Sequence, residues 1–185
     1  MCKEYVLFEE LLAYHCAPAL KGYKMANMFH VTRQQFPNAE QIVLDYNKKF
    51  KEKGLTFRIM QAEQPRITFY VYSKEKIFET LKQVEIKTFL KQLGYPVSSP
   101  SACLDFLETR MKESTYPHEI GLFLGYPLED VLGFINNKTC YCIGAWKVYD
   151  QKNVTRSKSL FTLFNILRDQ LIKAVDNGYP IEQIV

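Results

Sequence analysis

The sequence predicts an α+β protein in which helices cover a small, mostly antiparallel sheet of about four strands. Apolar residues recur with helical spacing in several long segments, whereas a few short segments are rich in β-branched and aromatic residues. The segments follow one another as helix, strand, helix, two strands, several helices, strand and helix. This order indicates a sheet built from neighbouring strands rather than from repeated βαβ units.

The composition fits one globular domain that spans residues 1–185. A chain of 185 residues is long enough to bury most of its apolar surface. Apolar residues make up 47% of the chain and charged residues 24%, which are ordinary values. The aromatic fraction of 14% is high, and we expect most of these rings to fill the core.

The first predicted elements are a helix and a strand. Apolar residues from position 4 to position 16 fall on one helical face. We expect this helix to end near Ala17, because Pro18 disfavours the helical conformation of the residue before it. A short strand is predicted at 28–32.

A second helix and a hairpin are predicted next. Asn38 is a plausible N-cap for a helix that extends to Lys53, with Gly54 as its C-terminal residue. Strands are expected at 55–60 and 66–72. A short link with a proline joins them, so the sequence predicts an antiparallel pair.

The second half of the chain is mainly helical. Ser99 and the proline after it are typical of a helix start. Residues 141–149 are rich in strand formers, with Gly144 as a bulge or a point of close approach. The other helices are expected at 74–83, 85–93 and 157–176.

Three Gly-Tyr-Pro triplets punctuate the helices. Their flanking sequences differ, so they do not indicate a structural repeat. We expect each glycine to end a helix in the left-handed conformation, each proline to prevent its continuation, and each tyrosine to pack back on the helix. The triplets are Gly94-Tyr95-Pro96, Gly125-Tyr126-Pro127 and Gly178-Tyr179-Pro180.

The middle triplet divides a predicted helical hairpin at 117–136. A hairpin of this kind resembles a DNA-binding helix-turn-helix. Its second helix, however, begins with Glu129 and Asp130, which would lie beside phosphates and repel them. Nucleic-acid binding is therefore not expected, and the net charge of +4, spread along the chain, agrees with this.

The sequence also argues against several other classes. No apolar run approaches the roughly 20 residues of a membrane span, and the N-terminus does not read as a signal peptide. We expect a cytoplasmic protein with five reduced cysteines. Phosphate-binding glycine loops and a Gly-x-Ser-x-Gly elbow are missing from the sequence, so nucleotide-dependent and classical hydrolase functions have no support.

Two histidine-containing pairs are the candidates for a catalytic or ligand-binding role. His118 and Glu119 follow a proline at a predicted helix start, where the helix dipole favours the acid as an anion and the imidazole as a neutral base or ligand. His15 and Cys16 lie at the predicted end of the first helix, where the carbonyl groups raise the pKa of a thiol. In both pairs a purely structural role is the competing interpretation.

A metal site has weaker support. Cys140 and Cys142 would place both sulfurs on one face of a strand, but no second cysteine pair has ligand spacing. A site made by His15, His118 and Cys142 would need these segments to meet in space.

Four segments together resemble a known family of small proteins from anaerobic firmicutes, catalogued as a domain of unknown function. The resemblance spans nearly the whole chain, and it implies a single domain in a bacterial cytosol and no particular reaction. The segments are His15-Cys16-Ala17-Pro18, Gly22-Tyr23-Lys24 with Asn27, the run from Pro117 to Pro127 with Asp130, and Trp146-Lys147-Val148-Tyr149.

The leading functional hypothesis is a polar pocket that binds a small molecule or a metal. Its candidate residues are His15, Cys16, Lys24, Asn27, His118, Glu119, Tyr126 and Trp146. In a catalytic version, Cys16 performs thiol chemistry, His118 is the base and Glu119 orients it. The alternatives are a non-catalytic module that binds a protein partner and, second, DNA binding through the hairpin. The sequence identifies no cofactor and does not decide whether the protein is an enzyme.

Overall fold

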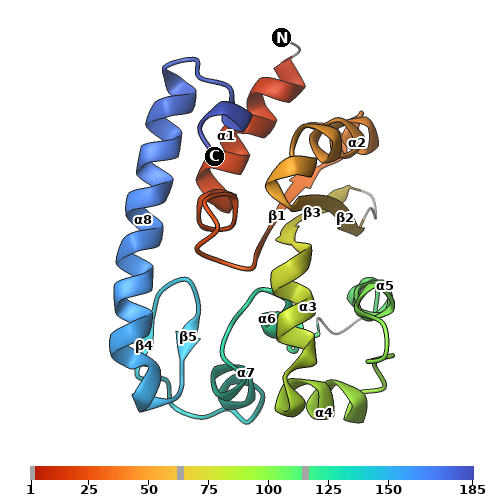
Figure 1. The fold of residues 1–185 in the computed structure, drawn as a ribbon, viewed down its shortest axis with the longest axis vertical. Helices are drawn as coiled ribbons and strands as arrows, with labels where there is room; N and C mark the ends of the chain where they lie inside the picture. Colours follow the sequence, from red (N-terminus) through yellow and green to blue (C-terminus); the bar gives the residue numbers. More distant parts are fainter. Residues whose placement is uncertain (1–2, 62–64, 114–116) are drawn as a thin grey trace. The chain divides into compact units, whose positions relative to one another are not determined.

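The computed structural model describes residues 3–61, 65–113 and 117–185, and it confirms the α+β class (Figure 1). The chain divides into two compact units. The first unit comprises Met1–Glu75 and Ile166–Val185, and the second comprises Lys76–Asn165.

The first unit contains a three-stranded antiparallel sheet in the order β1-β3-β2. Its strands are β1 (Ala26–Thr32), β2 (Leu55–Gln61) and β3 (Arg66–Ser73). Residues 67–72 of the central strand β3 are all buried, because both of its edges are paired and both of its faces are covered. The three predicted strands and the antiparallel pairing of β2 with β3 are confirmed. The middle of their predicted link, residues 62–64, lies outside the described residues.

Two helices of this unit pack on the sheet. The helix α1 (Lys3–Leu20) contacts β1 and β3, and α2 (Ala39–Lys49) contacts β2. Aromatic rings fill the space between these elements, as predicted. The ring of Phe8 is fully buried, and its centroid lies 4.8 to 6.4 Å from those of Phe29, Phe36, Tyr46, Phe57 and Phe69.

The predicted end of the first helix is wrong. The helix α1 continues through Pro18 to Leu20, and residues 16–20 are all buried. Burial of this last apolar turn outweighs the local effect of the proline. Gly22 then ends the helix with a φ of 74°, and the Tyr23 N–H donates to the Pro18 carbonyl at 2.8 Å. This is a Schellman cap.

The second predicted helix differs in two details. Asn38 occupies the N-cap position of α2, but its side chain makes no cap bond and donates instead to Glu4 Oε2 at 3.0 Å. The helix stops at Lys49 rather than Lys53, and a short 3₁₀ helix, η1 (Lys51–Lys53), follows it. Gly54 ends this segment with a φ of 68°, as expected.

The second unit is mainly helical. Ser99 caps α5 as predicted, because its hydroxyl accepts a hydrogen bond of 3.3 Å from the Ala102 N–H. The predicted helical hairpin is present as two short helices, α6 and α7. The helices that lie wholly or partly within this unit are α3 (Lys74–Lys82), α4 (Val84–Gln92), α5 (Pro100–Met111), α6 (Ile120–Phe123), α7 (Leu128–Ile135) and α8 (Val154–Asp176). The helices α3 and α8 each contribute residues to both units.

The single strand predicted at 141–149 is wrong. Two strands of two residues each, β4 (Cys142–Ile143) and β5 (Lys147–Val148), form an antiparallel hairpin instead. The chain turns at Gly144, which packs so closely on Phe161 that a Cβ would lie 2.1 Å from Phe161 Cδ2. The predicted close approach at this glycine is therefore confirmed.

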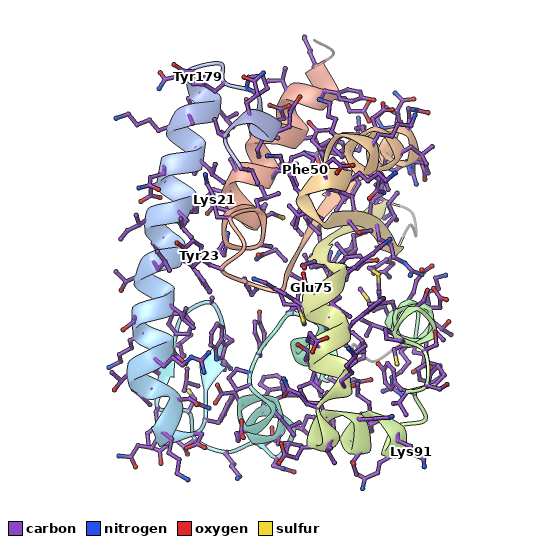
Figure 2. The ribbon with its side chains drawn as sticks, in the orientation of Figure 1. Lys21, Tyr23, Phe50, Glu75, Lys91 and Tyr179 are labelled. Atoms are coloured by element: carbon purple, nitrogen blue, oxygen red, sulfur yellow. The ribbon has the colours of Figure 1, made fainter. Side chains whose placement is uncertain are left out.

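The three Gly-Tyr-Pro triplets end helices as predicted. Their glycines have φ values of 79° to 84°. In each triplet the tyrosine N–H donates to the carbonyl five residues earlier, at 2.9 to 3.1 Å, which completes a Schellman cap. The packing of the tyrosines is less uniform. Tyr95 is buried and Tyr126 stacks on Trp146, whereas Tyr179 extends from the end of α8 and is 56% exposed (Figure 2).

Two short 3₁₀ helices complete the fold. They are η2 (Gln151–Asn153), whose N-cap Asp150 accepts from the Lys152 N–H at 2.9 Å, and η3 (Ile181–Gln183). None of the helices in the described ranges is long and apolar enough to cross a membrane.

Candidate functional site

An apolar pocket of about 290 Å³ opens in the second unit. The start of α6, the length of α7 and the strand β5 with its flanks provide its walls. Four of the lining residues are aromatic: Tyr126, Phe134, Trp146 and Tyr149. The walls are completed by His118, Ile120, Gly121, Asp130, Val131 and Lys147. Three sequence candidates, His118, Tyr126 and Trp146, therefore line one pocket.

A buried carboxylate holds the tryptophan in place. Asp130 is 2% exposed, and its Oδ2 accepts a hydrogen bond of 2.9 Å from Trp146 Nε1. Its Oδ1 accepts from the backbone N–H groups of Tyr149 at 2.7 Å and Asp150 at 3.1 Å. Asp130, one of the two acids at the start of the second hairpin helix, thus ties α7 to the segment after β5.

Stacking fixes the tryptophan from its other sides. The ring of Tyr126 lies 5.2 Å from the Trp146 ring, at an interplanar angle of 26°. The ring of Phe161 meets it edge-on at 4.6 Å. The Tyr126 hydroxyl donates to the Ala145 carbonyl at 3.1 Å, so Tyr126 is also bonded to the residue that precedes Trp146.

Two glycines allow the pocket walls to approach one another. A Cβ on Gly133 of α7 would lie 2.2 Å from Tyr149 Cβ, and a Cβ on Gly121 of α6 would lie 2.8 Å from Val131 Cγ2. Such separations are not compatible with a side chain at either position. The pocket is therefore shaped by close backbone packing, which preorganises its aromatic walls.

The imidazole of His118 and the ammonium of Lys147 lie at the pocket. The ring of His118 is exposed and meets Phe134 edge-on, with 5.0 Å between ring centroids. The Lys147 ammonium lies 5.6 Å from the centroid of the same phenylalanine ring. This is a cation–π arrangement that keeps a positive charge beside an apolar cavity.

Glu119 is engaged by other partners than His118. It is 3% exposed, and the Tyr95 hydroxyl donates to its Oε1 at 2.8 Å. Arg110 Nε lies 2.6 Å from the same oxygen, in a close charge contact that is not an aligned hydrogen bond. Burial raises the pKa of Tyr95, and the Glu119 charge adds to this effect. These contacts are those of a structural carboxylate that joins α5 to the start of α6.

The remaining candidates lie in the first unit. Cys16 is fully buried, and burial raises the pKa of its thiol well above the ordinary value, which the Lys24 charge offsets only in part. Burial lowers the pKa of Lys24 to about 8. A buried thiol with a raised pKa is protonated at neutral pH and is a poor nucleophile.

His15 and Asn27 are close to the sheet of the same unit. The His15 ring stacks on Phe29 at 5.3 Å, and partial burial lowers its pKa. The Asn27 Oδ1 atom is buried and makes no hydrogen bond within the part of the chain that the structure describes. Ligand-binding roles for these residues, and the catalytic roles of Cys16, His118 and Glu119, stay predictions.

The described ranges contain no metal-binding group of side chains, and their cysteines are free. Across 3–61, 65–113 and 117–185, no three His, Cys, Asp or Glu residues form a group that could hold a metal ion. The four cysteines in these ranges are free: Cys16 and Cys103 are buried, and Cys140 and Cys142 are half-buried.

Several pocket residues were not among the sequence candidates. They are Asp130, Phe134, Lys147 and Tyr149. Asp130 and Glu129 are the two acids of an otherwise apolar helix, and this was a usable signal for Asp130, because an acid that such a helix buries needs a partner. The sequence holds no comparable signal for Phe134, whose place at the pocket depends on how α7 meets the hairpin.

Fold and site together define a small α+β protein with an aromatic pocket in its helical unit. Residues 12–185 match the model of a family described as "Protein of unknown function (DUF3793)", and the chain belongs to this family. No curated protein and no solved structure matches the chain.

Proposed function

We propose that the protein binds a small, flat and largely apolar molecule in the aromatic pocket of its second unit. The observation that carries this proposal is the convergence of four aromatic side chains around an open apolar cavity of about 290 Å³. Ligand sites are commonly concave and apolar, with a few polar groups that set orientation. A cavity of this volume suits a ligand with a single ring or with two fused rings.

The rigidity of the walls supports a binding role. Trp146 is held by Asp130 and stacked against Tyr126, so its ring is ordered before any ligand arrives. A preformed wall lowers the entropy that binding must offset. The nearby glycine contacts have the same effect on the backbone.

The charges at the pocket indicate what the ligand carries. Lys147 and the exposed His118 are the groups that can reach a polar substituent, since the Asp130 oxygens already accept three hydrogen bonds. An ammonium at the wall favours an anionic substituent. The proposed ligand is therefore a flat ring system with one negative charge.

The dye 1-anilinonaphthalene-8-sulfonate tests this proposal, because it combines fused rings with a sulfonate. We expect saturable one-to-one binding that quenches the emission of Trp146, the only tryptophan in the sequence. Phe134→Ala and Lys147→Gln should each weaken binding by about tenfold. Tyr14→Ala, which removes a 54% exposed ring of the first unit, is the matched control and should bind as the wild type does.

Near-UV circular dichroism distinguishes a folded variant from a loosened one that binds the dye unspecifically. Unchanged dye affinity in a folded Phe134→Ala protein would contradict the proposal. Equal loss of affinity in Tyr14→Ala would do the same, because the dye would then bind elsewhere.

A further inference from the structure

A second pocket, of about 330 Å³, lies in the same unit and has a different chemical character. It shares Tyr126 and Trp146 with the aromatic pocket, so the stacked pair belongs to the walls of both. Its other walls come from the end of α3, the start of α4, the α6–α7 hinge and the start of α8. Most of its accessible lining is polar, whereas that of the first pocket is almost wholly apolar.

A buried serine lines this second pocket. Ser157 on α8 is 2% exposed and lines the cavity. Two other hydroxyl residues of the same helix, Ser159 and Thr162, donate to the carbonyl four residues earlier, each at 3.2 Å. Ser157 makes no such bond, and its hydroxyl has no partner among the residues that the structure describes. A hydroxyl that lines a cavity and forms no bond along its own helix is available to a ligand.

Charges of both signs line the same pocket. Glu85 and Glu129 line the pocket from the starts of α4 and α7, and Arg156 lines it from α8, next to Ser157. None of these three side chains forms an ion pair within the described parts of the chain. Two acids would repel an anion and an arginine would repel a cation. A molecule that carries both charges satisfies all three groups.

We propose that this second pocket binds a small zwitterion of the α-amino-acid type. Arg156 and the Ser157 hydroxyl donate hydrogen bonds to the carboxylate of the ligand. Glu85 and Glu129 accept hydrogen bonds from its ammonium group. The rings of Tyr126 and Trp146 offer a face to the same cation. An apolar side chain of the ligand lies against Ile86, Leu128 and Leu160, which are the aliphatic residues of the lining.

The proposal is tested with free amino acids as probes. Each common L-amino acid is titrated up to about 10 mM, well above the roughly millimolar Kd of a weak complex, while Trp146 emission and the thermal unfolding midpoint are recorded. At least one should bind saturably. If that amino acid is L-leucine, 4-methylpentanoate lacks only the ammonium and 3-methylbutylamine lacks only the carboxylate. Each half-analogue should bind at least about tenfold more weakly.

Variants then assign the binding to this pocket. Arg156→Gln and Glu129→Gln should each lower the affinity by about tenfold, and Ser157→Ala by about fivefold. Lys158→Gln removes an exposed charge from the same helix and should leave the affinity unchanged. Phe134→Ala, in the other pocket, should also leave it unchanged, which separates this inference from the proposed function.

Three results would overturn the proposal. One is the failure of every amino acid to bind in this range while the protein is folded. Another is amino-acid binding that persists unchanged in both Arg156→Gln and Ser157→Ala. Half-analogues that bind as tightly as the intact amino acid would show that only one charge is recognised, and would equally contradict a zwitterion site.

Discussion

The indole N–H of Trp146 donates to the carboxylate of Asp130 at 2.9 Å, so a buried acid of α7 holds the only tryptophan of the sequence. We predict that Asp130→Ala destabilises the fold by about 3 kcal/mol, because it leaves three donors without their acceptor. Denaturant unfolding followed by Trp146 emission measures this. The emission of the folded variant should also shift to longer wavelength as the indole loosens.

Glu129→Ala is the matched control for this prediction. Glu129 precedes Asp130 on the same helix but is exposed, so its removal should change stability by no more than about 0.5 kcal/mol. Equal destabilisation by both substitutions would show that the hydrogen bonds of Asp130 are not what stabilises the segment.

The closely packed glycines give a second prediction. Gly144→Ala should cost about 2 kcal/mol, because its Cβ would lie 2.1 Å from the Phe161 ring. Phe161→Ala removes that ring, so the cost of Gly144→Ala should fall by at least about 1 kcal/mol in this background. A double-mutant cycle by chemical denaturation measures the coupling. Strictly additive effects would contradict the close packing of this pair.

Gly133→Ala provides a contrast. Its Cβ would lie 2.2 Å from the Cβ of Tyr149. Because that carbon is present in every residue except glycine, Tyr149→Ala should not relieve the cost of about 2 kcal/mol. Rescue by Tyr149→Ala would show that the side chains, rather than the backbones, are in conflict.

Histidine titration gives a third prediction. His30 Nδ1 lies 2.8 Å from the Thr68 hydroxyl, and partial burial, helped by the charges of Arg66 and His15, lowers the pKa of His30 to about 4. Burial also lowers the pKa of His15 below its ordinary 6.5. NMR of the imidazole protons should show both midpoints below 6.5.

These shifts set the direction of the pH dependence. Between pH 6.5 and about 4 the unfolded chain binds more protons than the fold at these two positions. The free energy of unfolding should therefore fall as the pH drops through this window, and it should be insensitive to these groups above it. His30→Gln should make the decline shallower. A His30 midpoint at or above 6.5 would contradict its depressed pKa.

Thiol labelling gives a fourth prediction. In a Cys2→Ser background, the half-buried Cys140 and Cys142 should react with iodoacetamide at least about ten times faster than the buried Cys16. Peptide mass spectrometry of timed samples separates the sites. Rapid labelling of Cys16 in the folded protein would show an accessible thiolate and would restore its candidacy as a nucleophile.

Local signals made much of the fold predictable from the sequence. The Gly-Tyr-Pro caps and the Ser99 N-cap depend on a few neighbouring residues, and both have the expected geometry. The end of α1 was missed because burial of residues 16–20 outweighs the preference of Pro18. Tertiary packing thus outweighs a local conformational preference that would decide the end of an isolated helix.

The site was less predictable than the fold. The sequence pointed to His118 and Trp146, which do line one pocket. It paired His118 with Glu119 because they are adjacent, whereas Glu119 contacts Arg110 and Tyr95, which precede it by 9 and 24 residues. Residue spacing in the sequence does not reveal partners that only the fold brings together. The hydrogen bond between Asp130 and Trp146 was missed for the same reason.

The left-handed glycine caps make chirality a design variable. At Gly178 the φ is 83°, and an L-alanine Cβ would meet nothing within 4 Å, so its cost comes from the backbone alone. D-alanine prefers this region, because it is the mirror image of L-alanine. Peptide ligation close to the C-terminus could introduce D-alanine there, and it should stabilise the protein by restricting the unfolded chain, by up to about 1 kcal/mol. The same methyl group would thus destabilise or stabilise the fold according to its handedness.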